Sequence, residues 1–82
     1  MGTQNELVQR LEDGYNKFSK GQKKLADFIR EDYDKAAFMT AAKMGEEVGV
    51  SESTVVRFAT ALGYEGYPQF QRALGEMVRT KL

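Results

Sequence analysis

Hydrogen-bonding side chains recur at helical spacing from residue 52 onward, and several of them suit the edges of DNA base pairs. Arg57 offers a planar fork that fits guanine O6 and N7, Glu52 can accept from cytosine N4, and Ser53 can bond to either type of group. Val56 lies among them, and an exposed valine is favourable only if it meets an apolar group such as a thymine methyl. At about 100° per residue, one side of this helix carries Val55, Phe58, Ala59 and Leu62 and must face the core, and the opposite side carries Ser53, Val56, Arg57 and Thr60, with Glu52 at the N-terminal edge. Glu52, Ser53, Val56 and Arg57 are the predicted base-reading set.

A second group of polar residues suits contact with phosphate oxygens. Ser51 and Thr54 fall at the start of the same helical segment, where unpaired backbone amides also favour anions. Thr40 and Lys43 occupy the start of the preceding segment. The predicted phosphate-binding set is therefore Thr40, Lys43, Ser51 and Thr54.

Each of these residues also has a purely structural interpretation. Ser51 is a helix N-cap before it has any other role, Glu52 suits the helix dipole in a first turn, and Arg57 taken alone is a solvated charge. Thr54 would also serve to cover a junction between helices. DNA binding is favoured by the joint spacing of six residues, which are Gly45, Gly49, Val50, Ser51, Val55 and Phe58.

Two short helices, over residues 41–48 and 52–62, must position these side chains, with a three-residue turn between them. Gly49 falls where a left-handed backbone turn is least costly without a Cβ. Gly45 falls where the second helix would cross the first, so that any bulk there would separate them. The apolar residues spaced to pack between the helices are Met44, Val48, Val50, Val55 and Phe58. This pattern predicts a helix-turn-helix whose second helix enters the major groove.

The remaining sequence predicts three more helices and no strand. The first ends near Gly14, and its inner face is Leu7, Leu11, Tyr15 and Phe18. The second opens with the capping-box pattern Ser19–Gln22, and its inner face is Leu25, Phe28, Ile29 and Tyr33. The last has Pro68 at its start and Phe70, Leu74 and Met77 on its inner face. The expected fold is all-α, a compact five-helix bundle that contains a helix-turn-helix in a single domain, residues 1–82.

Residues 34–39 are expected to form a connector in which Phe38 fills the core. Tyr64 and Tyr67 are interpreted as aromatic residues of the core or of a turn, rather than as residues that stack on nucleobases. The Lys20, Lys23, Lys24 run is interpreted as a solvated helix face, with contact to the DNA backbone as the alternative.

Composition excludes several classes of function. With 82 residues, 41% of them hydrophobic and 29% charged, the chain suits a small globular module with one modest core. It contains neither cysteine nor histidine, and no spacing pairs its carboxylates for catalysis. We therefore predict no enzyme activity, no metal and no cofactor. No apolar run approaches the roughly 18 residues of a membrane span, and the first ten residues do not resemble a secretory signal, so a cytoplasmic location is expected.

The charge balance is less favourable to DNA binding, because Lys plus Arg equals Asp plus Glu at 12 each. Autonomous nucleic-acid binders are usually basic. A neutral module would bind weakly alone and depend on dimerisation, for which residues 1–18, with Leu7, Val8 and Leu11, are the expected contact. Zero net charge also suits a helical module that docks proteins without binding DNA, and this is the alternative interpretation.

The segment from Ser19 to Leu74 resembles the N-terminal domain of the RpiR family of bacterial transcriptional regulators. Its most specific part is GVSESTVVRF at residues 49–58, followed by Leu62-Gly63-Tyr64 and the Gly66-Tyr67 turn. The resemblance implies a helical domain that binds double-stranded DNA, expected to be a palindromic operator. It also implies a following sugar-isomerase-type domain that binds a phosphosugar effector and assembles homo-oligomers, with repression or activation of sugar or amino-sugar genes.

That second domain is absent from these 82 residues. The chain is therefore expected to be an excised N-terminal domain or a stand-alone relative, and no effector-binding residue can be assigned to it.

Overall fold

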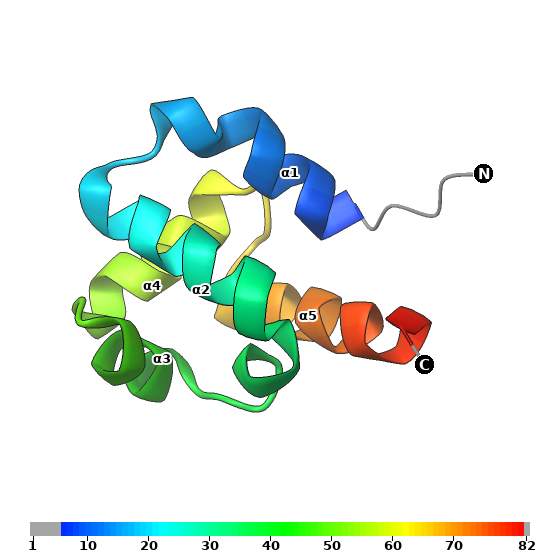
Figure 1. Cartoon of the computed structure of the whole chain (residues 1–82). Helices are drawn as coiled ribbons and strands as arrows, with labels where there is room; N and C mark the ends of the chain where they lie inside the picture. The colour runs from blue at the N-terminus through cyan, green and yellow to red at the C-terminus, as the bar shows by residue number, and fades with distance from the viewer. Residues whose placement is uncertain (1–5, 82) are drawn as a thin grey trace.

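The computed structural model describes residues 6–81, and helices joined by short loops, without strands, make up this part of the chain (Figure 1). Five α-helices and one short 3-10 turn follow one another: α1 (Glu6–Gly14), η1 (Tyr15–Lys17), α2 (Lys20–Ala36), α3 (Ala41–Val48), α4 (Glu52–Ala61) and α5 (Tyr67–Lys81). The predicted all-α bundle of five helices is confirmed.

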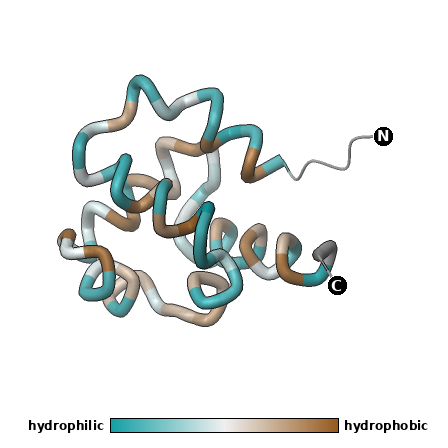
Figure 2. The backbone as a smooth tube through the Cα atoms, in the orientation of Figure 1, coloured by the Kyte–Doolittle hydropathy of each residue, from teal (hydrophilic) through white to brown (hydrophobic). Residues whose placement is uncertain are grey.

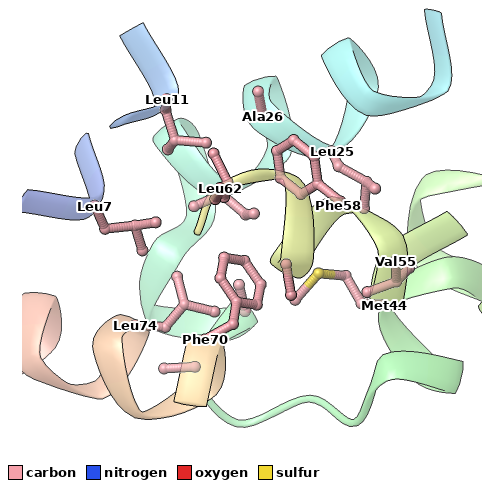
Figure 3. Close-up of a cluster of buried hydrophobic side chains, with 14 of the residues drawn as sticks. Leu7, Leu11, Leu25, Ala26, Met44, Val55, Phe58, Leu62, Phe70 and Leu74 are labelled. Atoms are coloured by element: carbon pink, nitrogen blue, oxygen red, sulfur yellow. The ribbon is translucent and has the colours of Figure 1, made fainter. Parts of the chain in front are cut away.

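One hydrophobic core joins all five helices, because each presents an apolar stripe toward the others. In Figure 2, hydrophobic residues recur between hydrophilic ones along each helix, as expected of amphipathic helices. Phe58 of α4 and Phe70 of α5 are fully buried and meet edge to face, with ring centroids 6.2 Å apart. Leucines of α1 lie on one side of these rings and Met44 of α3 on the other (Figure 3).

The helix-turn-helix is formed by α3, α4 and the turn between them, as predicted. Gly49 ends α3 with a left-handed backbone at φ 90°. A Cβ placed on Gly45 would lie only 2.7 Å from the carbonyl oxygen of Val50, so the two segments approach closely at that point. Thr40 and Ser51 cap the two helices. Val48 and Val50 lie at the edge of the core and are half-buried.

The start of α2 is also as predicted, with a complete capping box. The Ser19 hydroxyl accepts a hydrogen bond from the Gln22 amide, and the Gln22 side chain accepts one from the Ser19 amide. These two bonds satisfy amides that would otherwise be unpaired at the helix end.

The connector predicted for residues 34–39 is wrong in two respects. The helix α2 continues through Asp34 to Ala36, with a kink at Asp32, where φ is −128° and ψ is 45°. Phe38 does not fill the core and is 82% exposed. The physical reason is that Ala36 and Ala37 occupy the buried positions, which leaves the larger ring of the next residue on the surface.

The assembly contact expected of residues 1–18 stays a prediction, but the structure limits which side chains could form it. Leu7 and Leu11 are fully buried in the domain's own core, and Val8 is half-buried against it. The surface of the two leucines is therefore used within the fold, and Val8 keeps part of its surface exposed. Residues 1–5 of that predicted segment lie outside the described residues.

Candidate nucleic-acid interface

The helix α4 is oriented by its buried side. Val55, Phe58 and Ala59 are fully buried, so the opposite side of the helix must face solvent. Ser53, Val56, Arg57 and Thr60, together with Glu52 at the first turn, are all exposed. The predicted division of α4 into a core face and an outward face is confirmed.

An open hollow on the surface is lined by five residues of this helix and its cap: Ser51, Glu52, Ser53, Val56 and Arg57. All four predicted base-reading residues therefore lie together. Arg57 forms no ion pair with any residue that the structure describes, so its guanidinium donors are available to a ligand. Val56 is 38% exposed and presents an apolar surface beside that charge.

Three hydroxyl groups gather at the N-terminus of α4. The Ser51 hydroxyl accepts from the Thr54 amide at 3.1 Å, and it lies 2.8 Å from the Thr54 hydroxyl and 3.2 Å from that of Ser53. Three hydroxyls carry three protons, and the two bonds among them use two. One proton therefore stays available for an outside acceptor, next to the unpaired amides of the helix end.

Thr40 and Lys43, the other two predicted phosphate ligands, lie at the start of α3 and do not line the hollow. The Thr40 hydroxyl accepts from the Lys43 amide at 3.1 Å and so caps the helix. The Lys43 ammonium lies 3.6 Å from Glu46 Oε1, and both side chains are exposed. An exposed pair of this kind is weak, so Lys43 can exchange its partner for a phosphate at little cost.

The far end of α4 is held by a residue that sequence reasoning missed. Arg10 of α1 donates to the carbonyl oxygen of Leu62 at 2.8 Å, and its guanidinium lies 4.7 Å from the ring centroid of Tyr64. It also pairs with Glu6. A cation is favourable at a helix C-terminus, where carbonyl oxygens are unpaired. Because 52 positions separate Arg10 from Leu62, no local pattern could have revealed the contact.

The described residues contain no group of His, Cys, Asp or Glu that could hold a metal ion. Likewise, none of the described helices combines the length and apolar character needed to cross a bilayer.

Most of the chain is similar to known proteins. The model of the helix-turn-helix domain of the rpiR family matches residues 5–81. The HTH-type transcriptional regulator YfhH of Escherichia coli (strain K12) is 36% identical over 72 residues, which are 88% of this chain and 26% of that protein. An HTH-type transcriptional regulator of Clostridium perfringens (strain 13 / Type A) is 29% identical over 75 residues, which are 92% of this chain and 27% of that protein.

A solved structure of Vibrio vulnificus NanR, complexed with ManNAc-6P, superimposes with a TM-score of 0.84 at 33% identity. The match covers 92% of this chain and 29% of that one. This chain thus spans about a quarter of the length of the curated relatives that it matches. Since the family model covers nearly all of it, the chain belongs to the RpiR family of helix-turn-helix transcription regulators.

Proposed function

We propose that this domain binds double-stranded DNA sequence-specifically, with α4 in the major groove and Glu52, Ser53, Val56 and Arg57 at the base edges. The observation that carries the proposal is the hollow on the outward face of α4, where the unpaired Arg57 and the exposed Val56 lie side by side with hydroxyl groups. Arg57 would bind guanine, Val56 a thymine methyl, and Ser53 a base edge of either kind. Glu52 would accept from a cytosine or repel a wrong base.

Phosphate contacts would fix the position of α4 in the groove. Ser51 and Thr54 suit this role because they lie with the free amides at the N-terminus of the helix, where one hydroxyl proton is available. Thr40 and Lys43 would contact the backbone from the start of α3. None of these four contacts distinguishes one base from another.

The operator would be palindromic, because helix-turn-helix regulators bind as two-fold dimers to half-sites about 34 Å apart. The zero net charge of the chain supports this, since few phosphates would be neutralised by one copy. As the relatives are about four times longer, a further domain would supply homo-oligomerisation and effector binding. The NanR structure with ManNAc-6P supports a phosphosugar effector, and hence control of sugar or amino-sugar genes in the cytoplasm.

A selection of binding sites from random duplexes, performed with the whole 82-residue chain at low salt, tests the proposal. We expect one short motif to be enriched, and we expect fluorescence anisotropy to show tighter binding to that motif than to a scrambled duplex. If no duplex is bound at high protein concentration, a protein-docking module is the better interpretation. That alternative has less support, because the two large apolar side chains exposed in the described region lie in different segments: Phe38 in the loop between α2 and α3, and Val56 in α4.

A further inference from the structure

The first two turns of α2 carry only positive charge, although the helix dipole favours negative charge there. Positive charge at a helix N-terminus and negative charge near its C-terminus are both unfavourable. The first two turns of α2 nevertheless carry three lysines and no acid, and the rest of the helix carries four acids and two bases: Lys20, Lys23 and Lys24 at the start, then Asp27, Glu31, Asp32 and Asp34 with Arg30 and Lys35. Lys20 and Lys24 are also four residues apart, a spacing at which like charges repel.

Within the domain alone, the lysines at its start destabilise α2, although the capping box satisfies the amides at that helix end. The same lysines would be stabilising if a polyanion lay beside the first turn of α2. A charge order of this kind therefore indicates an external partner more directly than a general excess of lysine would.

The first turn of α2 lies directly against the start of α4. A Cβ placed on Gly21 would lie 3.4 Å from Val50 Cγ1 and 3.8 Å from Thr54 Cγ2, so the backbone of α2 touches the helix-turn-helix at that point. In Figure 1 both helices begin on the same side of the molecule. Lys20 and Lys24 are exposed and lie one helical turn apart, and at about 100° per residue they project about 100° and about 60° around the helix from Gly21.

The three lysines differ in the partners they already have. Lys23 lies over the ring of Tyr15, with its ammonium 5.4 Å from the ring centroid, and so it faces away from α4. Asp27, the nearest acid along the helix, accepts a hydrogen bond from the Tyr15 hydroxyl at 3.3 Å. Lys20 and Lys24 form no ion pair with any described residue. Their charges are therefore available to a ligand on the same side as Ser51 and Thr54.

We propose that Lys20 and Lys24 form a second phosphate-binding surface, which contacts the DNA backbone next to the groove that α4 enters. The inference rests on the proposed function and extends it to a helix outside the helix-turn-helix. A lysine ammonium is a point charge that attracts any phosphate, so this surface adds affinity without base preference. It also shows how a chain of zero net charge can bind DNA. Asp27 is the acid of α2 within one Debye length of Lys24, and its carboxylate already accepts from the Tyr15 hydroxyl, whereas Glu31, Asp32 and Asp34 lie about 10–15 Å from Lys24 along the helix.

The test compares three single variants of α2 in the whole 82-residue chain: Lys20→Gln, Lys24→Gln and the control Lys35→Gln. Lys35 is exposed on the same helix and loses the same charge, but it lies at the far end. Affinity for the selected site and for an unrelated duplex is measured by anisotropy across a salt series. Each variant at the start of α2 should reduce the slope of log K against log salt by about one and weaken binding to both duplexes alike. Lys35→Gln should keep the wild-type slope.

The variant Lys24→Arg keeps the charge and should also keep the slope, which separates loss of a phosphate contact from damage to the fold. Thermal melts supply a second check, because removing a cation from the start of α2 should not lower the melting temperature. If Lys20→Gln and Lys24→Gln have the same slope as Lys35→Gln, while Arg57→Ala still alters base preference, this inference is overturned and the proposed function stands. If the wild-type chain binds no duplex, both are overturned.

Discussion

The two junctions on either side of α3 are held in different ways. The turn between α3 and α4 is fixed by residues close in sequence: the amides of Gly49 and Val50 both donate to the Gly45 carbonyl oxygen, at 2.7 and 2.9 Å. The junction between α2 and α3 is held from a distance. The Tyr67 hydroxyl and the Gln71 side chain, both in α5, donate to the Met39 carbonyl oxygen at 2.7 and 2.8 Å.

This difference explains which junction could be predicted. A turn specified by its own glycine positions and cap is visible as a pattern in the sequence, whereas a loop held by α5 is not. The two junctions also have different structural roles. The α3–α4 turn sets the angle of the helix proposed to enter DNA, and the α2–α3 loop ties that unit to the rest of the bundle. Four substitutions test the comparison, in order of decreasing effect.

Among the four substitutions at the two junctions, the largest effect is expected at Gly45. In Gly45→Ala the new Cβ would meet the Val50 carbonyl oxygen at 2.7 Å, and because that oxygen belongs to the backbone the two helices must separate. We expect a loss of about 2–3 kcal/mol in the free energy of unfolding, measured by urea denaturation. Gly75→Ala in α5 is the matched control, since no atom lies within 4 Å of its added Cβ. Equal stabilities for the two variants would contradict the close approach at the α3–α4 junction.

A smaller loss is expected at Gly49, for a different physical reason. No atom lies within 4 Å of a Cβ added there, so the destabilisation of Gly49→Ala comes only from placing alanine in the left-handed backbone conformation at φ 90°. We expect about 1–2 kcal/mol of destabilisation. Gly49→Asn should recover part of it, because asparagine tolerates this conformation better than alanine. If alanine and asparagine are equally well tolerated, backbone strain does not determine the turn.

At the other junction, Tyr67→Phe removes one of the two hydrogen bonds to the Met39 carbonyl oxygen. Because Gln71 keeps that oxygen paired, we expect a loss of only about 1 kcal/mol. Burial raises the pKa of Tyr67 from its ordinary value of 10.0 to about 12. The neutral phenol is thus favoured in the folded state, and the stability it contributes is complete below pH 10 and lost as the pH rises toward 12.

Urea denaturation between pH 9 and 12 would check this dependence. The wild-type chain should lose stability more steeply over that range than Tyr67→Phe, because the variant lacks this titration. Burial also raises the pKa values of Tyr15 and Tyr64, so the variant should keep some alkaline sensitivity. Parallel curves for the two proteins would show that Tyr67 is not buried as described.

The smallest effect is expected at Phe38. Since this ring is 82% exposed, Phe38→Ser should change the free energy of unfolding by no more than about 0.5 kcal/mol. Phe70→Ala, which removes a fully buried ring, serves as the contrast and should cost about 3–5 kcal/mol. A large loss for Phe38→Ser would restore the expectation that this residue fills the core.

Much of the fold could be predicted because its determinants lie within a few residues of one another. The caps at Ser19, Thr40 and Ser51 and the left-handed Gly49 are examples. The error at Phe38 arose because large apolar residues are usually buried, while here two small alanines occupy the inner positions. The long-range bond from Arg10 to Leu62 leaves no local pattern.

The candidate interface was partly predictable in the same sense. Helical periodicity was sufficient to predict that Ser53, Val56 and Arg57 share the exposed face of α4, and the structure confirms it. Their contacts with bases stay a prediction, because exposure shows that a side chain is available and not what it binds. The charge order of α2 was visible in the sequence, but its position beside α4 was not.

The central claim is that the exposed face of α4 reads base pairs. It is tested most directly by measuring the affinities of wild type, Arg57→Ala and Ser51→Ala for the selected site and for duplexes changed at single base pairs. We predict that Arg57→Ala loses about 1–3 kcal/mol on the selected site and loses its preference at one position, while Ser51→Ala weakens all duplexes alike. Wild-type affinities and wild-type preferences for Arg57→Ala would contradict the account.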